Sequence, residues 1–190
     1  NPQITFFKVV YRRHTNFSME SIEQTFNGSA DFGKKVSCTI SRNGDLISKV
    51  YLQASLPALS STKKYVNWVG HQLIKDVEVE IGGQRIDKHY GDWLHIWNEL
   101  TQSSGLAEGY ADMVGNTSDL TTAPAKAKTL YIPLQFWFCR NPGLALPLIA
   151  LQYHEVKINM EFNSLTSCTN GDSGKSMTAS LYVDYIYLDT

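Results

Sequence analysis

The chain has 190 residues, of which 43% are hydrophobic, 12% aromatic and 18% charged. Seventeen Lys and Arg against eighteen Asp and Glu leave a formal net charge of −1. This balance excludes a generally basic nucleic-acid binder, because affinity for phosphates comes from clustered cations. A chain of this length predicts one domain whose core is large enough to fold without a disulfide or a metal. The charged fraction is below the roughly 25% of ordinary soluble domains, which favours a domain that covers part of its surface with a partner.

Short runs with a period of two residues dominate the chain and predict antiparallel β-strands, each with one buried face. In Val77–Ile81, for example, apolar residues alternate with glutamates. The Gly82-Gly83 pair that follows predicts a two-residue hairpin with positive φ, leading into Gln84–His89. In chain order, the other predicted strands are Ile4–Tyr11, Met19–Phe26, Lys35–Ile40, Val50–Leu56, Thr129–Cys139, Val156–Phe162 and Ala179–Leu188.

One segment has the period of a helix instead. Trp93, Ile96, Trp97 and Leu100 are spaced at i, i+3, i+4 and i+7, which predicts a short helix with one apolar face. Asp92 is placed to cap its N-terminus.

Two long segments show no firm period. Thr101–Lys128 is rich in Ser, Gly, Thr, Ala and Asp and predicts a long surface loop between strands. A second polar loop is predicted at Asn163–Ser176. Eight strands, one or two short helices and long loops between strands predict an all-β fold, an eight-stranded antiparallel jelly-roll sandwich that fills residues 1–190 as a single domain.

The cysteines and sequons add two expectations. Cys38, Cys139 and Cys168 are an odd number without a CxxC spacing, which predicts free thiols and a reducing site of synthesis. Asn27 and Asn116 open Asn-x-Ser sequons and are candidate glycosylation sites.

Candidate catalytic and metal-binding motifs are weak. His89, Asp92 and His95 are close in sequence, but the two histidines are six residues apart rather than the four of a helical zinc site. Gly171-Asp172-Ser173-Gly174 is similar to the nucleophile tetrapeptide of chymotrypsin-like proteases, without the glycine and histidine motifs that accompany it. The sequence therefore predicts no enzyme, no metal and no cofactor.

Two alternatives remain open at this point. Asp76, Glu78 and Glu80 line one strand face at spacings of ~6.5 to 7 Å, compatible with the paired carboxylates of a jelly-roll glycoside hydrolase. Trp68 and Tyr110 could instead serve as sugar platforms of a carbohydrate-binding jelly roll.

Aromatic residues favour a covered surface. Phe136–Phe138 lies within a predicted strand, as do Tyr182, Tyr185 and Tyr187, and in both strands residues of both faces are apolar. A strand that is apolar on both faces is covered on both, so a neighbouring domain or subunit is expected to supply the second cover.

Four stretches resemble one protein family in the order in which that family has them. They are Asn1–Phe17, Ile40–Ile47, Val79–Trp93 and Pro142–Val156. On these residues the chain resembles the major capsid proteins of large icosahedral double-stranded DNA viruses, and most of all those of algal viruses such as chloroviruses and other phycodnaviruses.

This resemblance implies a structural function in the virion capsid after synthesis in the host cytoplasm. Family members carry two consecutive jelly rolls and form homotrimeric, pseudo-hexagonal capsomers that contact one another and minor capsid proteins. The chain matches the first jelly roll, so we expect a fragment of a longer protein, with a single-roll derivative as the alternative. No direct contact with nucleic acid is expected, and any contact with an inner virion membrane is expected to lie outside this domain.

Candidate interface residues combine cations, the tryptophans of the predicted helix and a proline-containing connection. They are Arg12, Arg13, Arg85, Trp93, Trp97 and Pro142, the last opening the segment 142–151.

Overall fold

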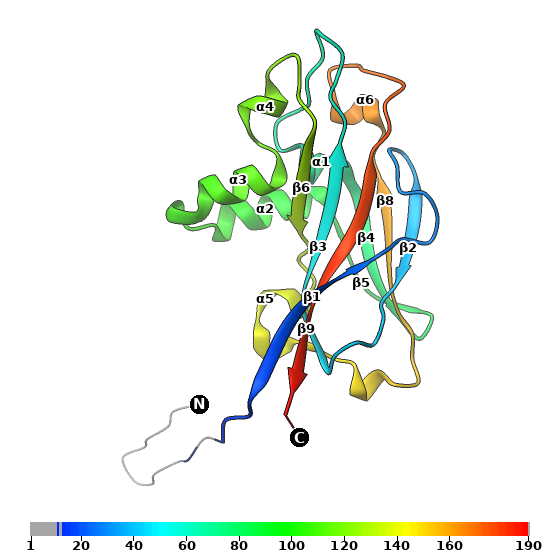
Figure 1. Ribbon diagram of the computed structural model, residues 1–190, viewed down its shortest axis with the longest axis vertical. Coiled ribbons are helices and arrows are strands. Elements are labelled where there is room, and N and C mark those ends of the chain that lie inside the picture. Colours follow the sequence, from blue (N-terminus) through cyan, green and yellow to red (C-terminus); the bar gives the residue numbers. More distant parts are fainter. Residues whose placement is uncertain (1–10, 12, 190) are drawn as a thin grey trace.

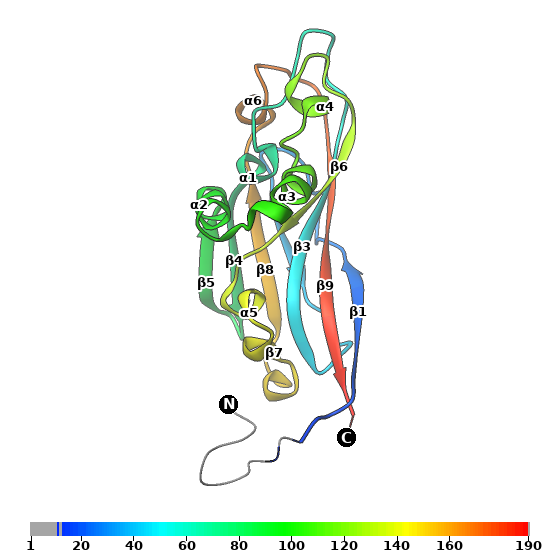
Figure 2. The ribbon, with the colours of Figure 1, turned by 90° about the vertical axis from the view of Figure 1, so that its left-hand side faces the viewer.

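The computed structural model describes residues 11 and 13–189, which form two antiparallel sheets packed face to face (Figure 1, Figure 2). The first sheet has the order β1–β9–β3–β6, with the short β7 paired to β3, and the second has the order β2–β8–β4–β5. This is the predicted jelly roll. The first sheet comprises β1 (Phe17–Gln24), β9 (Thr178–Leu188), β3 (Leu46–Leu56), β6 (Lys128–Pro133) and β7 (Leu146–Pro147). The second comprises β2 (Lys35–Thr39), β8 (Val156–Phe162), β4 (Ile74–Ile81) and β5 (Gln84–Tyr90).

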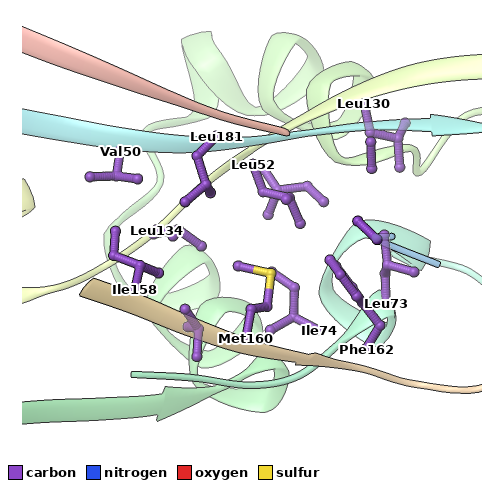
Figure 3. Close-up of a cluster of buried hydrophobic side chains, with 14 of the residues drawn as sticks. Val50, Leu52, Leu73, Ile74, Leu130, Leu134, Ile158, Met160, Phe162 and Leu181 are labelled. Atoms are coloured by element: carbon purple, nitrogen blue, oxygen red, sulfur yellow. The ribbon is translucent and has the colours of Figure 1, made fainter. Parts of the chain in front are cut away.

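The core lies between the two sheets and follows the predicted alternation. Along β8 every second residue from Val156 to Phe162 is buried, and the residues between them are half-buried. Figure 3 shows Ile158 and Met160 of β8 facing Val50 and Leu52 of β3 and Leu181 of β9. Burial of each such aliphatic or aromatic side chain stabilises the fold by roughly 1.5–3 kcal/mol.

The hairpin between β4 and β5 has the predicted glycine turn. Gly82 and Gly83 have φ values of 59° and 83°, the left-handed region that residues with a Cβ rarely adopt. Ile81 pairs with Gln84 directly across the turn, so the two-residue connection is confirmed.

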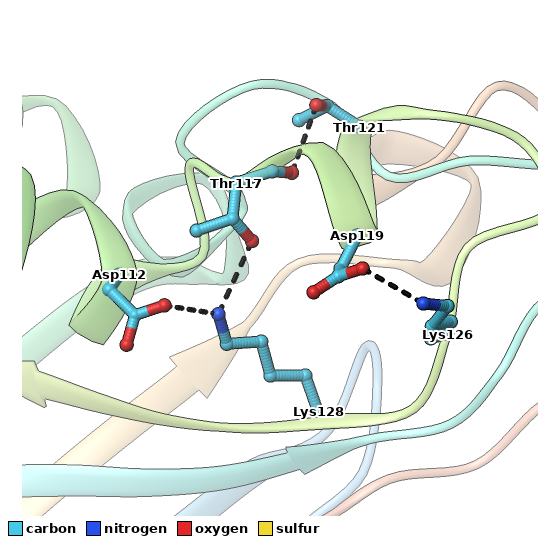
Figure 4. A network of polar contacts seen from close by, with 6 residues as sticks. All are labelled: Asp112, Thr117, Asp119, Thr121, Lys126 and Lys128. Carbon is cyan, nitrogen blue, oxygen red and sulfur yellow. Dashed lines mark hydrogen bonds and ion pairs between the residues drawn. The ribbon is translucent and has the colours of Figure 1, made fainter.

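The segment from Thr101 to Lys128 is not the irregular loop that the sequence predicts. It contains η1 (Ser104–Leu106), α3 (Ala107–Val114) and α4 (Ser118–Thr121), and Val114 and Leu120 are buried in the core. Figure 4 shows polar contacts that tie these helices to the start of β6. They join Lys128 Nζ to Asp112 Oδ1 at 2.6 Å and to Thr117 Oγ1 at 3.3 Å, Lys126 Nζ to Asp119 Oδ1 at 3.1 Å, and Thr121 Oγ1 to Thr117 O at 2.9 Å.

Two other sequence predictions are wrong in part. The predicted strand Thr129–Cys139 ends as β6 at Pro133 and gives way to α5 (Trp137–Arg140). The last backbone hydrogen bond to β3 runs from the N–H of Leu134 to Val50 O at 2.9 Å, after which Phe136 and Phe138 are buried in the core. The second polar loop contains α6 (Leu165–Cys168). Residues 4–10 of the predicted first strand lie outside the described residues.

The predicted helix is present as α2 (Gly91–Thr101), packed against α1 (Val69–Leu73). Its N-cap residue is Tyr90, so the predicted cap at Asp92 is wrong, although Asp92 lies in the first turn, where its charge favours the helix dipole. The buried side of α2 consists of Gly91, Leu94 and Asn98. None of the helices in the described part of the chain is long and apolar enough to cross a membrane.

Further short connections complete the fold. They are η2 (Pro142–Leu144) and η3 (Ile149–Leu151).

Candidate functional site

The apolar side of α2 faces away from the core, and we call its four residues, Trp93, Ile96, Trp97 and Leu100, the α2 outer face. Ile96 is 48% exposed and Leu100 is 74% exposed. The two indole rings lie 5.8 Å apart between centroids. The guanidinium of Arg140 lies over both rings, at 4.8 Å from Trp97 and 5.4 Å from Trp93. Each such cation–π contact contributes about 0.5–2 kcal/mol, so the rings are held in place while the rest of the face stays open.

The other predicted interface residues lie on separate elements. Arg13 is exposed ahead of β1, and Arg12 lies outside the described residues. Arg85 is on β5, with its Nη1 3.7 Å from Glu78 Oε2. Pro142 is exposed at the first position of η2, two residues after Arg140, so the structure brings its segment close to the α2 outer face.

Arg140 is the residue of this surface that sequence reasoning missed. The predicted strand ended at Cys139, so Arg140 was expected just beyond that end. The sequence indicated no partner for its side chain there. The available signal was an arginine next to the aromatic run Phe136–Phe138, which is a frequent setting for cation–π contacts.

A second cluster joins α1, α2 and α3 through their aromatic side chains. His71 Nδ1 lies 3.3 Å from His95 Nδ1, and His71 Nε2 lies 2.8 Å from the hydroxyl of Tyr110. The ring of Trp68 stacks on His71 with centroids 5.5 Å apart and an interplanar angle of 4°. Trp68 and Tyr110 therefore pack against a buried histidine, which argues against the predicted role of either ring as an open sugar platform.

The histidines predicted to lie together are separated. His95 meets His71, whereas the ring of His89 packs edge-on against Phe136 with centroids 4.7 Å apart. Within residues 11 and 13–189 there is no group of three or more His, Cys, Asp or Glu side chains that could hold a metal ion.

The carboxylates of β4 are held by neighbouring polar side chains on the outer side of the second sheet. Glu78 and Glu80 both accept hydrogen bonds from the side-chain amide of Asn159 and do not face each other across an open cleft. This arrangement does not favour the paired catalytic carboxylates of a glycoside hydrolase. The contacts run from Asp76 Oδ2 to Lys88 Nζ at 3.4 Å, from Glu78 Oε2 to Arg85 Nη1 at 3.7 Å, and from Asn159 Nδ2 to Glu78 Oε1 at 3.3 Å and Glu80 Oε2 at 3.2 Å.

The loop that is similar to a protease motif has a structural role. The carboxylate of Asp172 accepts hydrogen bonds from the backbone N–H of Ser60 at 3.0 Å and of Ser173 at 2.8 Å. These bonds lower the pKa of Asp172 and join the loop after β3 to the loop before β9.

The three cysteines are free thiols, as predicted. Burial raises the pKa of Cys38 to about 11 and those of Cys139 and Cys168 to about 12. Because the thiolate is the nucleophile, burial disfavours the reactive form of these thiols at neutral pH.

The candidate glycosylation residues differ in exposure. Asn27 is exposed beside β2, and its backbone N–H donates to Ser37 O at 2.6 Å. Asn116 is half-buried directly after α3. Both sites stay predictions, with Asn27 the more accessible of the two.

The buried histidines predict a stability that falls in mild acid. Burial, with a smaller contribution from His95, lowers the pKa of His71 to about 4 from 6.5, and burial together with Arg140 lowers the pKa of His89 to about 4. Between about pH 6.5 and pH 4 the unfolded chain binds protons that the folded chain does not, so the free energy of unfolding decreases as the pH falls. Each histidine removes up to ~3 kcal/mol over this window.

Denaturant unfolding at pH 7 and pH 4.5 checks this expectation. The His89→Leu variant should lose about half of the pH dependence that the two histidines supply. An unchanged pH dependence in His89→Leu would show that His89 is protonated equally in both states.

Taken together, the described residues form a jelly-roll sandwich with buried or half-buried thiols, carboxylates engaged by neighbouring side chains and an open apolar helix face. The family described as "Major capsid protein N-terminus" matches residues 5–189. The chain belongs to this family of viral structural proteins, as the sequence resemblance predicts.

Individual relatives agree with this assignment. The major capsid protein of Pyramimonas orientalis virus is 69% identical over 195 residues, which cover 100% of this chain and 49% of that protein. The major capsid protein of Paramecium bursaria Chlorella virus 1 is 47% identical over 199 residues, covering 100% of this chain and 44% of that protein. In structure, a chain of the quasi-atomic PBCV-1 virus capsid superposes with a TM-score of 0.81 at 45% identity, covering 97% of this chain and 46% of that one. The chain thus spans about half the length of the relatives that it matches.

Proposed function

We propose that the chain is the N-terminal jelly roll of a major capsid protein that self-associates to form the icosahedral shell of a virion. The observation that carries this proposal is the similarity of nearly the whole chain, at 45% identity, to a protein of an assembled viral capsid. Shell formation needs a rigid fold with surfaces for partners, and the sandwich with its exposed α2 outer face is suited to that function.

The full-length protein is proposed to carry a second jelly roll and to form homotrimers, which contact one another and minor capsid proteins. The length of the relatives, about twice that of the chain, supports the second domain. Exposed apolar residues such as Leu100 support an obligate interface, because such interfaces are rich in apolar surface.

Trimer contacts are proposed to include the α2 outer face and the segment that begins at Pro142. Arg13 and Arg85 are exposed and available for rim contacts, where charged residues tune association more than they strengthen it. Arg12 stays a candidate from the sequence alone.

Native mass spectrometry of the full-length gene product tests the proposal. We expect a polypeptide of about twice 190 residues in a complex of three copies that persists at micromolar concentration. A product that stays monomeric at capsid-forming concentrations would contradict the proposed function.

A further inference from the structure

The outer side of the first sheet changes character along its strands. At the end of the sheet closer to α4 and α6, this outer side is polar, and its side chains form hydrogen bonds with one another. Gln53 Nε2 donates to the hydroxyl of Tyr131 at 3.0 Å, and Ser180 Oγ donates to Gln53 Oε1 at 3.2 Å. Such a surface is stable in contact with water.

The opposite end of the same side is apolar. Residues directly opposite each other in an antiparallel pair share one side of the sheet. Met19 pairs with Ile186, Ile186 with Leu46, and Leu46 with Pro147, so one row crosses β1, β9, β3 and β7. Phe17 pairs with Leu188 in the next row. We call this surface the exit patch, and it consists of Phe17, Met19, Leu46, Pro147, Ile186 and Leu188.

The exit patch faces away from the core. Tyr185, the neighbour of Ile186 along β9, is fully buried on the inner side, and side chains alternate along a strand. Phe17 is 65% exposed, Met19 is 54% exposed and Leu188 is 43% exposed. Ile186 is 8% exposed and Leu46 is half-buried, so the exposed part of the patch consists of Phe17, Met19 and Leu188 on β1 and β9 and Pro147 on β7. Single exposed apolar side chains are ordinary, but a group of them on neighbouring strands marks a contact surface.

The chain leaves the sandwich at this patch. The N–H of Leu188 donates to Asp45 Oδ2 at 2.7 Å, and the N–H of Asp189 donates to Asn16 O at 2.9 Å. These bonds fix the end of β9 beside the start of β1, as Figure 1 shows. Whatever follows Asp189 in a longer protein therefore starts within reach of the exposed apolar side chains.

We propose that the polypeptide following Asp189 in the full-length protein folds back onto the exit patch and covers it. This inference rests on the proposed function, which supplies a second half as long as the first. A segment that begins beside its docking surface closes a short loop at little cost in entropy. The patch is bounded in the next row by Lys49, which pairs with Asp184, but its own side chains are apolar, so the covering segment is expected to be apolar. Because that segment is joined to the end of β9, we expect the contact to lie within one chain rather than between subunits.

Photo-cross-linking in the full-length protein tests this contact. The Phe17→p-benzoylphenylalanine variant places the probe in the patch at little steric cost, because the side chain is aromatic and exposed. Met19→p-benzoylphenylalanine is the second probe position, in case the first variant fails to fold. Thr129→p-benzoylphenylalanine, at the polar end of the same side of the sheet, is the matched control.

We expect cross-links from Phe17 to peptides beyond residue 190, formed within one chain. An equal mixture of ¹⁵N-labelled and unlabelled protein identifies that chain, since a contact between copies gives mixed-isotope products. A tethered segment has an effective concentration on the order of millimolar, so at micromolar protein the intrachain product should exceed the mixed product by about a hundredfold. The Thr129 control should give far less of the intrachain product.

Three other outcomes would overturn the proposal: cross-links to residues 1–10, mixed-isotope products, or no cross-link from either patch position. Native mass spectrometry of the same samples reads the oligomeric state separately. A monomer with intrachain cross-links would refute the proposed trimer and support the contact at the exit patch. A trimer without intrachain cross-links would support the proposed trimer and refute the contact at the exit patch.

Discussion

The Gly91→Ala variant is expected to be less stable than the parent protein by at least ~3 kcal/mol. A Cβ at this position would lie 2.0 Å from the backbone oxygen of His71 and 2.4 Å from that of Ile74. Neither atom is at the end of a flexible side chain, so α2 must move away from the junction of α1 and β4. For a domain of this size that loss corresponds to a fall of roughly 6–12 °C in Tm, measured by thermal and denaturant unfolding.

Gly109→Ala is the matched control on α3. A Cβ at Gly109 meets no atom within 4 Å, and alanine in a helix is favoured over glycine by roughly 0.5–1 kcal/mol. The control should therefore be as stable as the parent or slightly more so. If the two variants behaved alike, the close approach of α2 to α1 would be wrong.

Strands such as β8 were predictable because they divide their residues between core and solvent. In β8, residues Val156–Phe162 alternate without a break, and the boundaries read from the sequence match the structure. The Gly82-Gly83 turn was equally local, since only the backbone conformation of two residues decides it. Where structure depends on two or three neighbouring residues, the sequence was sufficient.

The short helices were not predictable in the same way. Helix α3 has only eight residues and contains Gly109, so neither its period nor its propensity stands out. Its position is fixed by distant contacts instead, such as the burial of Val114 and the ion pair between Asp112 and Lys128. In α5, strand-forming aromatics were placed in a helical turn by their burial in the core, which overrode their local preference.

The candidate surfaces were half predictable. The spacing of Trp93 and Trp97 indicated an apolar face, but only the burial of Gly91 and Leu94 on the other side of α2 shows that this face points outward. Likewise, the partner of His95 is His71, 24 residues earlier, and no local pattern connects them. Arg140 reaches the α2 outer face because α5 exists, and the sequence predicted a strand there.

The α2 outer face provides the test with the largest expected effect on assembly. In the full-length protein, the double substitution Ile96→Gln with Leu100→Gln should leave the subunit folded, because both side chains are exposed and glutamine is a good helix former. If this face is a subunit contact, losing two buried aliphatic side chains costs at least ~3 kcal/mol per contact and weakens trimer formation by about a hundredfold or more. Analytical ultracentrifugation across a concentration series measures the loss of trimer, with circular dichroism to verify the fold.

The pair Ile96→Met with Leu100→Met is the matched control. It keeps the apolar surface and should trimerise like the parent protein. Equal trimer stability in the Gln and Met pairs would place the α2 outer face outside the subunit contacts and leave the segment at Pro142 and the three candidate arginines as the remaining candidates.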